Sequence, residues 1–191
     1  MYLDDAVAAT ASFEGRIHWM YLDTNEQATV TVGVGQMVPT AQAALQYRFR
    51  RPNAEVADAA EILAEFARVQ QMKPGYSAKA YRRSDSLLLA DEDIDHALRQ
   101  TMAACVADLA SLFPDFHDYP EPAKVGLVDM RFNLGLTNLR LKFPKFCKLV
   151  KAQRWEAASL ECHRIGPSEE RNAWTKEQFL LAGSTAREKT L

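Results

Sequence analysis

The chain contains one short stretch with a strand-like residue pattern, followed by a long stretch with a helix-like pattern. This order limits the folds that the chain can adopt. Residues 17–35 are rich in β-branched and aromatic residues, with the polar run Thr24–Gln27 between two such stretches. This pattern predicts a β-hairpin from about residue 17 to residue 35. Beyond it, apolar residues recur at the spacing of amphipathic helices. The sequence therefore predicts an α+β fold, with a small hairpin near the front and a larger helical part behind it.

The predicted helices begin at acidic or capping residues and end near glycine or proline. A short helix over 4–14 precedes the hairpin and is followed by Gly15. Behind the hairpin, helices are expected at 54–71, from Asp91 to about Leu112, from Pro122 to about Leu134 with Gly135 as its cap, at 145–152, at 154–163, and in a last segment capped by Ser168.

The bulk composition narrows the class of protein. The chain has 191 residues and a formal net charge of −2, so no basic face for nucleic acid is expected. No apolar run reaches the roughly 18 residues that span a bilayer, so we expect no membrane insertion. The start lacks the basic region and apolar core of a secretory signal, which predicts synthesis in the cytoplasm without a signal peptide. Cys105, Cys147 and Cys162 are an odd number without C-x-x-C spacing, which predicts reduced, buried thiols.

Two acidic residues near the start suit glycoside hydrolysis. This reaction usually needs one carboxyl group that protonates the leaving oxygen and a second that handles water or the sugar cation. Glu14 is predicted at the end of a helix and Asp23 at the end of a strand, so the two groups should have different environments. Because the chain has 25 acidic residues, this spacing alone does not single the pair out.

Blocks from both ends of the chain agree, in order, with one known family. They are Phe13-Glu-Gly-Arg, Trp19-Met-Tyr-Leu-Asp23-Thr, Thr31-Val-Gly-Val-Gly35, Asp129-Met-Arg-Phe-Asn-Leu-Gly135, Arg154-Trp-Glu-Ala-Ala158 and Arg171-Asn-Ala. These blocks resemble the phage-type lysozymes of glycoside hydrolase family 24. The resemblance runs from about residue 4 to residue 182, densely at both ends and thinly between 38 and 110.

The resemblance implies a fold and a reaction. The fold would be a single lysozyme-like domain over 1–191 in which two lobes flank a groove. One is a hairpin lobe with a helical insert over about 15–90, and the other is a helical lobe over about 91–182 plus the helix 4–14. The reaction would be that of a muramidase, which hydrolyses the β-1,4 bond between N-acetylmuramic acid and N-acetylglucosamine in peptidoglycan. It would need no metal and no organic cofactor.

The resemblance also implies roles for individual residues. Glu14 would be the general acid, while Asp23 and a threonine would position the attacking water. Thr31 keeps the family's sequence register, whereas Thr29 keeps the count from Asp23 because the intervening loop is two residues longer. Both lie on one face of a strand, because side chains alternate, and we favour Thr31. The supporting residues would be Phe132 and Asn133, which line the groove, and Arg171, which pairs with Glu14.

Several alternatives stay open at this point. The site would also suit a related glycan such as chitosan or chitin, and a lysozyme-like fold without activity would be a binding module. The segment 40–86 is longer than in the short phage enzymes and includes the basic run Tyr47–Arg51. It is expected to cover the groove, narrow its specificity or bind a partner.

Delivery to the wall is equally open. A phage endolysin, a delivered toxin with an immunity protein, and an enzyme carried by a phage particle all fit a chain without a signal peptide. In each case the enzyme would act on the bacterial cell wall, in the periplasm, after release or delivery. The sequence does not decide between inverting and retaining stereochemistry, nor does it give the oligomeric state.

Overall fold

The computed structural model describes residues 2–24 and 28–188, and it divides into two compact units. The sheet unit is Glu14–Gln100, and the helical unit is Met1–Phe13 with Thr101–Leu191. The long helix α4 (Asp91–Leu112) contributes residues to both units. Of the polar turn predicted at Thr24–Gln27, residues 25–27 lie outside the described residues.

A three-stranded antiparallel sheet of order β1-β2-β3 forms the centre of the sheet unit. Its strands are β1 (Ile17–Leu22), β2 (Val30–Gly33) and β3 (Gln36–Met37). The predicted hairpin is therefore confirmed, and Tyr21 lies opposite Thr31 in its register. The third strand was not predicted, because a strand of two residues leaves no alternating pattern in the sequence.

The turn between β2 and β3 depends on a glycine and a buried glutamine. The backbone N–H of Val34 donates to Oε1 of Gln36 (2.6 Å), whose side chain is buried. Gly33 has a positive φ of 66°, and a Cβ atom at that position would collide with Gln36 Oε1. The Gly-x-Gly-Gln segment therefore has a structural role at the turn.

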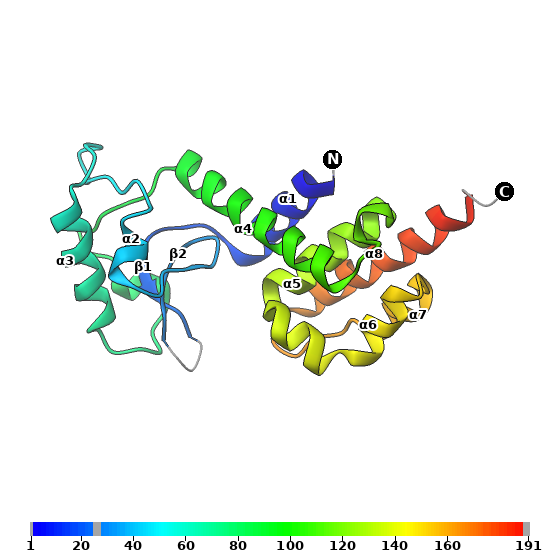
Figure 1. Ribbon diagram of the computed structural model, residues 1–191. Coiled ribbons are helices and arrows are strands. Elements are labelled where there is room, and N and C mark those ends of the chain that lie inside the picture. The colour runs from blue at the N-terminus through cyan, green and yellow to red at the C-terminus, as the bar shows by residue number, and fades with distance from the viewer. Residues whose placement is uncertain (1, 25–27, 189–191) are drawn as a thin grey trace. The chain divides into compact units, whose positions relative to one another are not determined.

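The insert over 40–86 contains α2 (Ala41–Ala44), α3 (Ala59–Gln70) and the 3₁₀-helix η1 (Ala78–Tyr81). The predicted start of a helix at residue 54 was wrong by five residues. Asp58 is the true N-cap, because its carboxylate accepts from Glu61 N–H while the Glu61 carboxylate accepts from Asp58 N–H. Figure 1 shows α3 beside the small sheet.

The insert is fixed to β1 through Trp19. The indole Nε1–H donates to the carbonyl of Ala78 (2.8 Å), and the Arg82 guanidinium lies 4.7 Å from the centre of the ring. Trp19 therefore packs the insert against the sheet, within one unit.

The helical unit is built from α1 (Tyr2–Glu14, up to Phe13), the end of α4, the short η2 (Phe116–Asp118), α5 (Glu121–Lys142), α6 (Pro144–Lys151), α7 (Trp155–Ser159) and α8 (Glu169–Glu188). Figure 1 shows α5 to α8 grouped together. Helices α5 and α8 pack closely at Gly126, where an added Cβ would meet the Phe179 ring. Arg171 N–H donates to Ser168 Oγ (3.2 Å), which confirms the predicted cap of α8.

Two predicted helix ends differ from the structure. Gly135 does break α5, with φ 75° and ψ 155°, but helical structure resumes and runs to Lys142. The segment after Gly135 was missed because it is short and follows a glycine of the kind that commonly ends a helix. Helix α7 ends at Ser159, four residues before the predicted end.

The three cysteines are free and buried, as predicted. Burial raises the pKa of each thiol, that of Cys162 to about 11, so the thiols stay protonated at neutral pH. Over residues 2–24 and 28–188, no helix is both long and apolar enough to cross a membrane. The same residues contain no group of three or more His, Cys, Asp or Glu placed to hold a metal ion.

Candidate active site

The two predicted catalytic carboxylates both belong to the sheet unit. Glu14 is the last residue of α1 and is exposed. Gly15 follows with a positive φ of 73°, which ends the helix and turns the chain into β1. Asp23 comes directly after β1 and is half-buried. A helix end and a strand end therefore supply the two groups, as the sequence predicted.

Hydrogen bonds with backbone groups fix Asp23 at the loop end of the hairpin. Its N–H donates to the carbonyl of Thr29 (3.0 Å), and its Oδ1 accepts from Thr24 N–H (2.7 Å). In the register of the hairpin, Thr29 is thus directly across from Asp23. One oxygen of the Asp23 carboxylate is therefore oriented by the backbone.

Thr31 lies two residues after Thr29, on the same face of the hairpin. It is opposite Tyr21 on β1, and its hydroxyl donates to the carbonyl of Thr29 (3.1 Å). Thr31 is only 1% exposed, whereas Thr29 is half-buried. The structure places Thr29 across the hairpin from Asp23 and Thr31 across from Tyr21, and the choice of Thr31 stays a prediction.

The pKa of Tyr21 depends on the charges of both candidate carboxylates. Its pKa is raised to about 12, first by burial and then by the negative charges of Asp23 and Glu14. Both carboxylates therefore act on one phenol group on the hairpin face that also carries Thr31. Sequence reasoning missed Tyr21, although its position two residues before Asp23 predicts a shared face.

A cavity of about 520 Å³ lies beside the hairpin. Thr29 lines it, together with residues from the strand ends and from the insert. The insert contributes Phe66, Gln70, Met72 and Pro74, and the remaining lining residues are Leu22, Ala28, Val30, Val38 and Pro39. The insert therefore forms one wall of a cavity next to a candidate catalytic threonine.

The predicted supporting residues lie in the helical unit. Arg171, on α8, is buried and pairs with Asp129 on α5 (Nη2–Oδ1 2.7 Å), and its guanidinium lies 5.5 Å from the centre of the Phe13 ring. The pairing of Arg171 with Glu14 joins residues of different units and stays a prediction. Phe132 is half-buried and Asn133 is exposed on α5, and their place in a groove also stays a prediction.

Asp129 forms a buried cluster that sequence reasoning missed. One carboxylate oxygen accepts from Arg164 Nη2 (2.7 Å) and from Thr175 Oγ1 (2.8 Å), and the other accepts from Arg171 Nε (2.9 Å). All four side chains are at least 95% buried. A buried carboxylate requires such partners because an isolated charge is costly in the interior. The only sequence signal was an acidic residue within an otherwise apolar run of α5.

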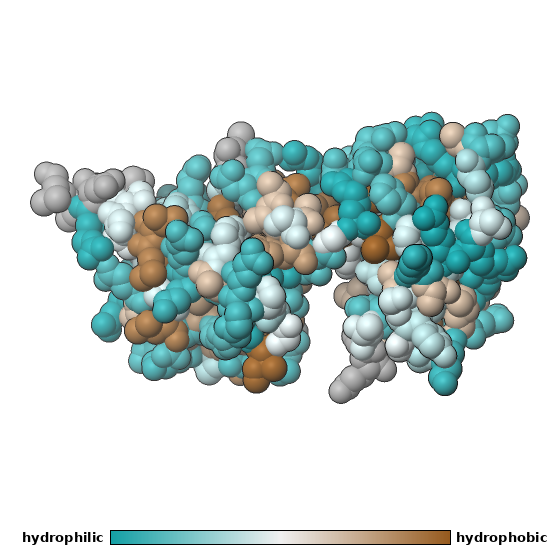
Figure 2. All heavy atoms as spheres, turned by 180° about the vertical axis from the view of Figure 1, so that it is seen from behind, coloured by the Kyte–Doolittle hydropathy of each residue, from teal (hydrophilic) through white to brown (hydrophobic). Residues whose placement is uncertain are grey.

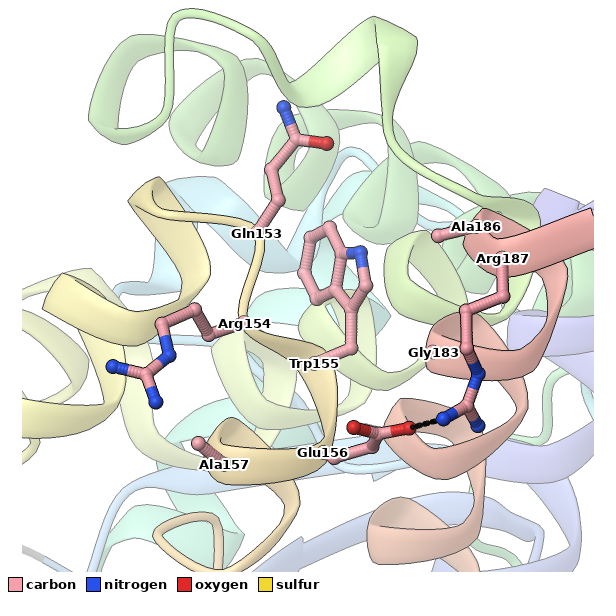
Figure 3. A pocket seen from close by; sticks show the side chains of 8 residues that line it. All are labelled: Gln153, Arg154, Trp155, Glu156, Ala157, Gly183, Ala186 and Arg187. Atoms are coloured by element: carbon pink, nitrogen blue, oxygen red, sulfur yellow. Dashed lines mark ion pairs between the residues drawn. The ribbon is translucent and has the colours of Figure 1, made fainter. Parts of the chain in front are cut away.

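A second cavity, of about 630 Å³, lies in the helical unit. It is formed by the start of α7 and the end of α8, and Figure 3 shows the Glu156–Arg187 ion pair (2.7 Å) at its edge. Trp155 faces this region and is 2% exposed, so it belongs to the core of the helical unit. The cavity is lined by Gln153, Arg154, Trp155, Glu156, Ala157, Gly183, Ala186 and Arg187, none of which is a predicted site residue.

Solved structures similar to this chain include the muramidase domain of SpmX from Asticaccaulis excentricus. The TM-score is 0.53 and the sequence identity 16%, over 92% of this chain and 95% of that chain. No protein-family model matches the chain, and no curated protein does so. At this identity the likeness concerns the fold, and the chain has a lysozyme-like α+β fold, mainly helical with a small antiparallel sheet. Membership of the phage-type family in particular stays a prediction.

Proposed function

We propose that this protein is a muramidase, which hydrolyses the β-1,4 bond between N-acetylmuramic acid and N-acetylglucosamine in peptidoglycan. One observation carries the proposal. In a lysozyme-like fold, Glu14 and Asp23 lie at the end of a helix and the end of a strand of one unit, and the charges of both act on Tyr21. The similarity to a solved muramidase domain supports the reaction class.

In this proposal Glu14 is the general acid. It gives its proton to the glycosidic oxygen as the bond from that oxygen to the muramic acid C1 breaks. A water molecule forms the new bond to C1 and gives its proton to Asp23, whose carboxylate Thr24 N–H holds in place. Thr31 positions this water from the neighbouring strand. The product carries a reducing muramic acid, and a single displacement of this kind inverts the configuration at C1.

Arg171 has a supporting role in this proposal, in which it pairs with Glu14. Its guanidinium lies over the ring of Phe13, the residue directly before Glu14 in the chain. The Asp129 cluster also holds Arg171, with Arg171 Nε donating to Asp129 Oδ1. An arginine anchored in this way loses little side-chain freedom when it binds a further carboxylate.

The first test is a product analysis with isolated sacculi. The intact chain should release fragments that end in reducing muramic acid, identified by mass spectrometry. Glu14→Gln and Asp23→Asn should each lower kcat by at least about a hundredfold, because general acid–base groups contribute about 10² to 10⁴. The matched control is Asp5→Asn, which neutralises an exposed acid on the same helix as Glu14.

Three results would contradict this proposal in different ways. Intact sacculi that bind the protein would indicate a binding module. Release of fragments only from chitin or chitosan would indicate a different glycan as substrate. Full activity in Glu14→Gln would leave the reaction in place but exclude Glu14 as its acid.

A further inference from the structure

The segment 139–154 is the most basic part of the chain. It contains six Lys or Arg residues and no Asp or Glu, in a protein with a net charge of −2. All six are exposed, and they lie at the end of α5, along α6 and just before α7. They are Arg140, Lys142, Lys145, Lys148, Lys151 and Arg154.

Helix α6 exposes the charged side chains that lie on it. Its apolar residues Phe146, Cys147 and Val150 are buried in the helical unit, while Lys148 and Lys151 are exposed. The helix therefore has a buried apolar face and an exposed cationic one, and the cationic face belongs wholly to the helical unit.

The basic segment differs from the basic run predicted at 47–51. There, Arg50 pairs with Glu92 (3.3 Å) and Arg51 with Glu61 (2.7 Å), so these charges are neutralised within the sheet unit. In the segment 139–154, Lys145 pairs with Glu161 (2.6 Å). Within residues 2–24 and 28–188, none of the other five cations of that segment is paired with a carboxylate.

Large apolar side chains are exposed beside these cations. Leu141 is 65% exposed and Leu160 is 70% exposed. A surface depression of about 280 Å³ brings Leu160 together with Lys142 and Lys145. Figure 2 shows hydrophobic side chains among hydrophilic ones on the surface of the helical unit. We call the surface formed by Arg140, Leu141, Lys142, Lys145, Lys148, Lys151 and Leu160 the cationic–apolar face.

We propose that the cationic–apolar face binds the surface of an anionic lipid bilayer. Lysine and arginine side chains bind acidic headgroups, and the leucine side chains enter the boundary between headgroups and acyl chains. A dissolved polyanion would use only the charges and would leave Leu141 and Leu160 in water. A bilayer of acidic lipids accepts both kinds of side chain, and it needs no helix that crosses the membrane.

The proposal is tested with the full chain and vesicles by co-sedimentation. The protein should sediment with vesicles of phosphatidylglycerol in phosphatidylcholine and not with phosphatidylcholine alone, and added salt should weaken the binding. Lys148→Glu with Lys151→Glu should weaken it by at least about tenfold, because each cation near an anionic surface contributes to attachment. Leu141→Ser with Leu160→Ser should weaken binding several-fold on the same vesicles.

The control is Lys73→Glu with Lys79→Glu, which makes the same charge change at two exposed lysines of the insert. It should leave vesicle binding unchanged, and circular dichroism should show that each variant is folded. Three results would overturn the proposal: no binding to anionic vesicles, equal binding to neutral ones, or equal loss in the control. Binding to sacculi but not to vesicles, abolished by Lys148→Glu with Lys151→Glu, would assign the face to the wall polymer instead. Because vesicles contain no glycan, these results are independent of muramidase activity.

Discussion

The two units of this protein use their acidic residues in opposite ways. In the helical unit, Asp129 is buried and bound by two arginines and a threonine. In the sheet unit, Glu14 is exposed and Asp23 is half-buried at the loop end of a hairpin. A fully paired carboxylate in the interior holds elements together, whereas a carboxylate at the surface can reach a substrate. The contrast assigns a structural role to Asp129 and agrees with the proposal that Glu14 and Asp23 carry the chemistry.

The largest effect expected from this contrast concerns stability. Asp129→Ala should lower the free energy of unfolding by about 3–5 kcal/mol, because it leaves two buried guanidinium groups without their shared carboxylate. Asp23→Ala should change it by less than about 1 kcal/mol, as is usual for positions near the surface. Urea unfolding followed by circular dichroism measures both values. Equal losses of unfolding free energy in the two variants would contradict the different roles given to Asp129 and Asp23.

The second expected effect distinguishes Thr31 from Thr29 in the proposed reaction. Thr31→Val keeps the shape of the side chain and removes the hydroxyl that is proposed to hold the water. It should lower kcat on sacculi by about tenfold to a hundredfold, while Thr29→Val should change kcat by less than about threefold. The reverse order would assign the role to Thr29, which lies directly across the hairpin from Asp23. Thermal unfolding of both variants separates lost activity from lost structure.

The smallest effect compares one tyrosine from each unit. The pKa of Tyr21 and that of Tyr119 are both raised to about 12, mainly by burial. Asp23 and Glu14 add to the rise at Tyr21, and Asp115 adds to it at Tyr119. Asp23→Asn should therefore lower the pKa of Tyr21 and leave that of Tyr119 unchanged, as site-resolved NMR titration would show. An unchanged Tyr21 would mean that Asp23 does not act on this part of the hairpin.

Tyr21 and Tyr119 also make the stability of the folded protein depend on pH. Their folded-state pKa values lie above the ordinary value of 10, so the folded chain keeps protons that the unfolded chain loses. Their contribution to stability is complete below pH 10 and is lost as the pH rises from about 10 to about 12. Asp23→Asn should make the part due to Tyr21 smaller, because its folded-state pKa falls toward the ordinary value.

Local patterns in the sequence predicted most of the elements. The β-branched and aromatic stretches that form β1 and β2, the acidic start of α4 and the cap of α8 at Ser168 were all confirmed. Each of them depends on neighbours within a few residues, which a sequence displays directly. The errors occurred at the start of α3, at the end of α7 and after Gly135. At α3 the local Asp58–Glu61 capping box marks the true start, and after Gly135 the helix resumes past a residue that commonly ends one.

The residues around the candidate site also fall into those that the sequence could predict and those that it could not. Glu14, Asp23 and the two threonines were singled out by the resemblance to a known family, and their places at a helix end and on a hairpin could be predicted because local structure fixes them. The Asp129 cluster was not found, since its members are up to 46 positions apart and meet only when α5 and α8 pack. Likewise, the sequence drew attention to the arginines at 48–51, but Arg50 and Arg51 are paired in the structure, and the exposed charge lies at 139–154.

The sequence by itself determined the class of fold, since this follows from short-range periodicity, whereas the pair of carboxylates was proposed from the resemblance of several blocks to a known family. Only the tertiary structure decided which charges are neutralised and which stay exposed. Whether a charged side chain is paired depends on what packs against it, and those partners come from distant parts of the chain. Asp129 is bound in the interior, while Lys148 and Lys151 remain in water, for this reason.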